Sequence, residues 1–224
     1  SPILSGLVGS EMCIRDSVAF HKESKIGGEA GMKYFIVGSV ASGVGLYGLS
    51  MLYLWAGSLQ FNVLAEQFVI NGTDPLPLIA MGFVLVGFGF KVSAAPFHFA
   101  APDAYAGASS PIAGILATAS KAMGIIGLLR MLLIVAAPEA SEDGTVWLTL
   151  LGILSLVTMT WGNIAALGST NPKRMLAYSS VAHAGYMLAA ITAFGAWNWD
   201  DSLAGDAGES AVAVLTALIF HLVV

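Results

Sequence analysis

Apolar residues gather in six long runs along this chain, separated by short polar segments. The runs cover residues 34–57, 78–95, 112–136, 146–167, 175–194 and 210–224, and the last is the shortest. About 20 residues of helix cross the hydrocarbon core of a bilayer, because a helix rises ~1.5 Å per residue. The pattern predicts an all-α, polytopic transmembrane helix bundle of about six spans, the sixth incomplete.

Residues 1–17 do not continue this pattern. They hold an apolar run too short to span a bilayer, and they lack the basic region and the small-residue cleavage site of a signal peptide. Their text resembles translated sequencing-adapter read-through, and a divergent native helix end is the alternative. We expect 1–17 to be non-native, and 18–224 to be a fragment of one transmembrane domain.

Composition narrows the class of protein. Hydrophobic residues make up 57% of the 224 residues and charged residues 10%, whereas soluble domains average about 25% charged residues. The single cysteine, Cys13, excludes disulfide, CxxC and iron–sulfur motifs within this chain. No P-loop or dinucleotide-binding glycine pattern occurs either. We therefore expect no cofactor, metal or nucleic acid on this chain, and a lipid bilayer around it.

The polar segments alternate in charge. Successive crossings place 18–33, 96–111 and 168–174 on one face, and 58–77, 137–145 and 197–209 on the other. The first set, taken as surface loops, carries Lys22, Lys25, Lys33, Lys173 and Arg174. The second set is acidic and has no Lys or Arg. Positively charged loops favour the cytoplasmic side, so we expect the first set to face the cytoplasm or its equivalent.

Lys91 lies near the end of the second apolar run. Because a charge inside a spanning helix is unfavourable, such a residue is a candidate functional site. Pro96 removes a backbone donor and disfavours helix at the residue before it, so we expect a break between about Lys91 and Pro96. Broken helices are tolerated at membrane depth where they line a wet or protein-buried cavity. Lys91 is therefore a candidate proton-transfer group; the alternative is that its ammonium reaches the nearer membrane surface.

Lys121 lies near the middle of the third run, between apolar or small residues 112–120 and the stretch AMGIIGLL. Both membrane surfaces are more than about 10 Å away by the helical rise. A desolvated ammonium gives up its proton more readily than an exposed one. Lys121 is thus a second candidate for proton transfer, against the alternative of a structural charge.

His98 and His183 are further candidates for proton transfer. An imidazole titrates near neutral pH and suits a proton relay. The alternative for each is a histidine that is simply hydrogen-bonded at a helix interface. Asp103 and Tyr105 are expected to fix the polar segment 96–111 rather than to conduct protons.

Three stretches carry a resemblance to a known family. FKVSAAPFHFAAPDAYAGASSP (90–111) and ASKAMGIIGLLR (119–130) resemble the antiporter-like, proton-translocating subunits of respiratory complex I. NPKRMLAYSSVAHAGYML (171–188), with EAGMKYFIVGSVASGVGLYGLSMLY (29–53), is similar to subunit N of NADH-quinone oxidoreductase. The resemblance covers about 18–224.

The resemblance implies an inverted-repeat bundle of about fourteen spans, of which this fragment holds the end of the fifth to part of the eleventh. It implies that Lys91 adjoins the break in the seventh span, that Lys121 is the central lysine of the eighth, and that His183 lies in the tenth. The family's fifth-span glutamate would precede Val18, and Glu29 is not its equivalent. The twelfth-span charge lies beyond the fragment, and Ala106 stands where the family often has Glu.

The implied function is proton translocation across a membrane, expected to be the bacterial inner membrane. It would be driven by quinone reduction in partner subunits of complex I that handle NADH and quinone. Two alternatives stay open. One is a cation/proton antiporter or membrane-bound hydrogenase subunit of the same superfamily, and the other is a structural membrane subunit without transport. If the gene lies among genes for complex I subunits, the complex I function would be favoured over the antiporter.

Overall fold

The computed structural model describes residues 17–18, 25–71, 74–135, 142–197 and 216–217, and these are almost entirely helical. The elements are α2 (Lys25–Ala56), α3 (Phe61–Asn71), α4 (Pro75–Val92), α5 (Ala100–Gly107), α6 (Ser110–Ile115), the π-helix η1 (Leu116–Ser120), α7 (Lys121–Val135), α8 (Glu142–Leu167) and α9 (Pro172–Trp197). The described residues contain no strand. The predicted all-α fold is confirmed.

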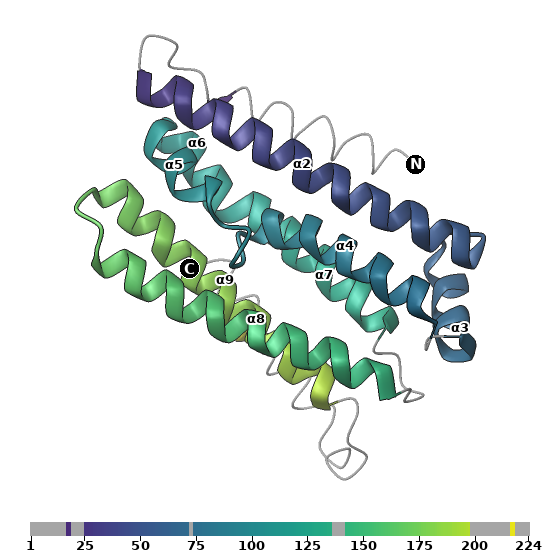
Figure 1. Ribbon diagram of the computed structural model, residues 1–224. Coiled ribbons are helices and arrows are strands. Elements are labelled where there is room, and N and C mark those ends of the chain that lie inside the picture. The colour runs from purple at the N-terminus through teal and green to yellow at the C-terminus, as the bar shows by residue number, and fades with distance from the viewer. Residues whose placement is uncertain (1–16, 19–24, 72–73, 136–141, 198–215, 218–224) are drawn as a thin grey trace.

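The long helices lie side by side in three layers (Figure 1). α2 forms one outer layer and contacts α4 and α5. The middle layer holds α4, α5 and the continuous stretch α6–η1–α7, and the paired α8 and α9 form the other outer layer. Four stretches, in α2, α4, α6–α7 and α8, are long and apolar enough to cross a membrane. Large apolar side chains on the outside of α2, including Phe35, Val40 and Leu54, are exposed, as suits a bilayer-facing surface.

Several predicted boundaries differ from the observed ones. The segment 18–33 is not a loop throughout, because α2 already begins at Lys25. Its first turns pack against α5: a Cβ added to Gly107 would lie 2.5 Å from the Cβ of Ala30. The segment 58–77 likewise contains helix α3, which packs against α7. The predicted incomplete span 210–224 lies outside the described residues except at 216–217.

The remaining spans match in place and differ at their ends. α6–η1–α7, α8 and α9 begin earlier than the runs 112–136, 146–167 and 175–194. The run 78–95 corresponds to α4, which ends at Val92. The segment 96–111 is not a surface loop alone, because it contains α5. Seven residues without helix, 93–99, separate α4 from α5.

The predicted break lies between Lys91 and Pro96, as the proline indicated. α4 ends where Ser93 adopts a left-handed conformation with φ 63°. The backbone N–H of Ser93 donates to Phe90 O at 3.1 Å, and that of Ala94 donates to Gly89 O at 2.8 Å, so the last carbonyls of α4 keep partners. The N–H of Ala95 donates to Thr158 Oγ1 of α8 at 3.0 Å. The interruption is thus bonded to a neighbouring helix rather than left open.

The described polar segments lie at the ends of the bundle, as the charge pattern predicted, whereas 19–24 and most of 137–145 and 197–209 lie outside the described residues. The loop between α8 and α9, the first turns of α2, and α5 meet at one end, whereas α3 lies at the other (Figure 1). Lys33, Lys173 and Arg174 therefore share one end of the molecule, which we call the basic end.

Candidate functional site

The stretch of π-helix immediately before Lys121 is a feature that the sequence did not predict. η1 covers Leu116–Ser120, and α7 begins at Lys121 itself. A π-helical turn holds more than the usual 3.6 residues and often occurs at functional positions. Thr118 Oγ1 donates to Gly114 O at 2.9 Å within the same stretch.

Lys121 is buried inside the bundle. Its residue is only 3% exposed, and its ammonium donates to both the backbone oxygen and the hydroxyl of Ser180 on α9, at 2.6 and 2.7 Å. An ammonium has three donors and no acceptor, so two of its three hydrogens point at one residue. The partners lie 59 positions apart in the sequence.

A buried tyrosine of α5, Tyr105, lies on the side of α9 that carries Ser180. The Tyr105 side chain lies near Ser180, and Tyr34 of α2 packs against the same cluster. Tyr105 is buried among Ala101, Leu116 and other small or apolar side chains. Ser180 of α9 is thus the partner of the Lys121 ammonium, and no local sequence pattern marks this serine.

Lys91 lies on the last turn of α4, and its side chain is partly buried. A Cβ built on Gly124 of α7 would be 3.0 Å from Lys91 Cγ and 3.0 Å from Val92 Cγ2. The lysine stem therefore packs on α7 one turn after Lys121. Lys91 also lines a cavity of about 330 Å³, with Ser42 and Phe88 among its walls. The structure thus places Lys91 against α7, one turn after Lys121, whereas the Lys121 ammonium binds Ser180 of α9.

The two histidines differ in their surroundings. His98 follows the break in α4, is 5% exposed, and stacks on Phe99 with ring centroids 5.0 Å apart. Its Nδ1 is the one buried side-chain nitrogen or oxygen without a hydrogen-bond partner among the described residues. His183 lies on α9 with an exposed side chain, packed edge-on against Tyr186 at 5.7 Å. The ring contact of His183 is thus with a neighbour on its own helix.

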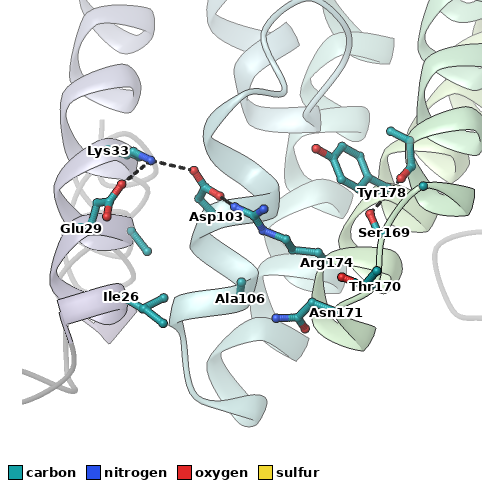
Figure 2. A pocket seen from close by; sticks show the side chains of 13 residues that line it. Ile26, Glu29, Lys33, Asp103, Ala106, Ser169, Thr170, Asn171, Arg174 and Tyr178 are labelled. Carbon is teal, nitrogen blue, oxygen red and sulfur yellow. Dashed lines mark hydrogen bonds and ion pairs between the residues drawn. The ribbon is translucent and has the colours of Figure 1, made fainter.

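The basic end contains a pocket of about 660 Å³ (Figure 2). Asp103 of α5 sits between two cations from different helices: it accepts from Lys33 of α2 at 3.1 Å and pairs with Arg174 of α9. Lys33 also pairs with Glu29 at 2.6 Å, one turn earlier on α2. The ammonium of Lys173 donates to Ala108 O, just beyond α5, at 3.0 Å. Asp103 therefore fixes α5 between α2 and α9, in agreement with the role expected from its position.

No group of three or more metal-binding side chains occurs among the described residues. The groups described here that can exchange protons include the ammonium of Lys121, the hydroxyls of Ser180 and Tyr105, and the imidazole of His98.

Comparison with known proteins identifies the family of the chain. A family described as NADH:quinone oxidoreductase/Mrp antiporter, TM, matches residues 7–223, a match that starts inside the segment 1–17. NADH-quinone oxidoreductase subunit N of Rubrobacter xylanophilus is 43% identical over 195 residues, which are 87% of this chain and 38% of that protein. The chain therefore spans less than half the length of this relative.

Solved structures share the fold. A chain of respiratory complex I from Thermus thermophilus is 32% identical with a TM-score of 0.64, covering 92% of this chain and 43% of that one. Two others, an archaeal membrane-bound sulfane sulfur reductase and the Mrp complex of Dietzia sp., are 22% identical. The sulfane sulfur reductase has a TM-score of 0.73 and covers 94% of this chain and 43% of its own. The Mrp complex has a TM-score of 0.70 and covers 89% of this chain and 34% of its own. At this identity, both show the fold alone. The family and the apolar helices together identify a membrane protein.

Proposed function

Because this chain belongs to the NADH:quinone oxidoreductase/Mrp antiporter transmembrane family, we propose that it is part of a subunit N that moves protons across the membrane in NADH-quinone oxidoreductase. The proposed driving force is quinone reduction in other subunits of the complex, which also handle NADH. The bilayer is proposed to be a bacterial inner membrane, since the relative from Rubrobacter xylanophilus is bacterial. The partners are then the other membrane subunits of complex I.

The observation that carries this proposal is the buried ammonium of Lys121. At 3% exposure in an apolar span, an idle charge would be unfavourable by roughly 3 kcal/mol on insertion scales. The penalty is understandable if the side chain titrates during turnover. Its bonds to Ser180 give the protonated form a defined position. No described carboxylate pairs with this ammonium, so none of them would trap the proton.

Lys91 is the second proton-exchanging group in this proposal. It adjoins the break in α4, and its stem packs on Gly124 of α7, one turn from Lys121. A change in charge at one lysine therefore alters the electrostatic energy of the other through a short stretch of protein. His98 sits at the break with Nδ1 unpartnered and can accept a proton on this path. His183 is proposed to act further along, on the exposed side of α9.

The alternative from the same superfamily is a cation/proton antiporter subunit. The 43% identity to a subunit N, against 22% to the Mrp structure, favours subunit N. A structural subunit without transport is the other alternative. It predicts that replacing Lys121 leaves proton pumping unchanged.

The test replaces Lys121 in the full-length subunit assembled in its complex. Lys121→Ala and Lys121→Arg should assemble and reduce quinone, yet pump fewer protons per quinone reduced in sealed vesicles. Arginine should not rescue pumping, because a guanidinium keeps its proton. The matched control is Lys25→Ala, which removes the same charge at an exposed position. Pumping at the wild-type ratio in both Lys121 variants would leave the lysine as a structural charge and overturn the proposal.

A further inference from the structure

Four charged side chains from three helices form one chain of ion pairs at the basic end (Figure 2). Glu29 pairs with Lys33 on α2 at 2.6 Å, and Lys33 donates to Asp103 on α5 at 3.1 Å. Asp103 also pairs with Arg174 on α9. The side chain of Asp103 is 22% exposed, against 48–67% for the other three, so this central carboxylate is the most buried member of the chain of ion pairs.

The contact between α5 and α2 does not depend on Asp103 alone. The two helices are closely packed, since a Cβ on Gly107 of α5 would lie only 2.5 Å from the Cβ of Ala30 on α2. Lys33 also has a second carboxylate partner, Glu29, on its own helix. If the charge of Asp103 were removed, Lys33 would stay paired and α5 would stay packed on α2.

The contact between α5 and α9 depends more on charge. Arg174 of α9 pairs with Asp103 and with no other carboxylate among the described residues. The ammonium of the adjacent Lys173 donates to Ala108 O, just beyond α5, at 3.0 Å. The buried apolar residue that α9 contributes to the cluster around α5 is only an alanine, Ala177. Because exposed ion pairs add little to folding stability, we expect the Asp103–Arg174 pair to set a position rather than to keep the chain folded.

The position of α9 matters because α9 carries the partner of Lys121. The backbone oxygen and the hydroxyl of Ser180 accept from the Lys121 ammonium at 2.6 and 2.7 Å. Ala177, three residues before Ser180, packs in one cluster with Tyr105 of α5 and Leu116 of η1, the π-helix that ends immediately before Lys121. A hydrogen bond is weak beyond about 3.5 Å, so a shift of α9 by ~1 Å would break these bonds.

We propose that Asp103 is a positioning residue for proton transfer, which through Arg174 holds α9 where Ser180 meets Lys121. The inference deepens the proposed function and rests on it. No proton passes through Asp103 in this role. When its pair with Arg174 is broken, α9 shifts at the basic end and the Lys121 ammonium loses the partner that orients it. Proton transfer requires donor and acceptor within hydrogen-bonding reach, so it is sensitive to such a shift.

The experiment measures protons pumped per quinone reduced, for the full-length subunit in its assembled complex in sealed vesicles. Asp103→Asn and Arg174→Gln should each lower this ratio by about twofold or more while quinone reduction continues. Asp103→Glu, which keeps the charge, should recover most of the pumping. The matched control is Glu29→Gln, which makes the same change from carboxylate to amide at the exposed end of the chain of ion pairs. It leaves Asp103 paired with both cations and should pump normally.

Two further variants separate a pair of residues that act together from two independent effects. If Asp103 and Arg174 act through their ion pair, the double variant Asp103→Asn/Arg174→Gln should pump no worse than either single variant. Lys33→Gln should lower the ratio less than Arg174→Gln, because close packing at Gly107 also holds α5 on α2. Additive losses in the double variant would show that the pair is not the acting unit.

The results separate this inference from the function on which it rests. If Lys121→Ala lowers pumping while Asp103→Asn and Arg174→Gln pump at the wild-type ratio, the positioning role is wrong and the proposed function stands. If the Asp103→Asn complex does not assemble, Asp103 is a structural residue and the inference is again wrong. An equal loss in Glu29→Gln would assign the effect to surface charge. If Lys121→Ala itself pumps normally, the proposed function and the positioning role fall together.

Discussion

The backbone N–H of Ala95, in the break after α4, donates to the side-chain oxygen of Thr158 on α8 at 3.0 Å. Thr158 is 0% exposed, and its own hydroxyl donates to Leu154 O at 2.6 Å. One hydroxyl thus satisfies a donor that the interrupted helix leaves without an intrahelical partner. A buried N–H without a partner is unfavourable by about 1–3 kcal/mol, so this bond helps to make the break tolerable in an apolar interior.

Thr158→Val should therefore destabilise the protein by about 1–3 kcal/mol, because valine keeps the shape and leaves the Ala95 N–H unsatisfied. The measurement is thermal unfolding of the purified subunit in detergent. Thr160→Val is the matched control. Thr160 lies two residues after Thr158 on α8, and its hydroxyl donates to Leu156 O of its own helix. Equal unfolding temperatures for the two variants would show that the Thr158 bond does not support the break.

Close packing of α8 against α9 gives a second prediction. A Cβ on Gly162 would lie 2.7 Å from the backbone nitrogen of Ala182, whereas one on Gly152 would meet only Thr192 Cγ2, at 3.6 Å. Gly162→Ala should push the helices apart and destabilise the protein by roughly 1–3 kcal/mol. Gly152→Ala, on the same helix, should be neutral or stabilising because alanine favours helix. Detergent unfolding of both variants checks this, and equal stability would contradict the assigned contact.

The features predicted from the sequence are those that one segment determines alone. The apolar runs located the long helices, since length and composition decide whether a helix suits a bilayer. Pro96 located the break, because a proline loses a backbone bond wherever it stands. Lys91 and Lys121 were found because each is a charge within an apolar run. These signals need no knowledge of which helices are neighbours.

The features that were missed depend on contacts between distant segments. α2 begins at Lys25 in a polar stretch because its first turns pack against Gly107 of α5. The partner of Lys121 is Ser180, 59 positions away, and no local pattern marks that serine among the others. The π-helical turn before Lys121 has no composition of its own, since LATAS would also form an ordinary helix. Tertiary packing decides all three.

Sidedness gives a third prediction. Thr170, in the loop between α8 and α9, lies at the basic end, and Gln60 precedes α3 at the opposite end; both are exposed. With Cys13 replaced by serine, Thr170→Cys and Gln60→Cys should react with a membrane-impermeant thiol reagent from opposite sides of sealed vesicles. Thr170→Cys should react from the cytoplasmic side, because Lys and Arg gather at its end. Labelling of both positions from one side would contradict the arrangement of the spans.

The last prediction concerns the contact between Lys91 and α7. The stem of Lys91 and the side chain of Val92 both lie 3.0 Å from the place where a Gly124 Cβ would be. Gly124→Leu should displace the lysine from α7 and lower the number of protons pumped per quinone reduced, if the position of Lys91 beside Lys121 matters. Gly124→Ala, which adds one carbon, should have the same effect to a smaller degree. Gly114→Leu is the matched control on the same span, since nothing lies within 4 Å of a Cβ there, and it should pump normally. Assembly is checked first by recovery of the whole complex, so that a loss of pumping reports on the lysine and not on folding. Normal pumping by both assembled Gly124 variants would show that the Lys91 stem need not lie against α7 for proton transfer.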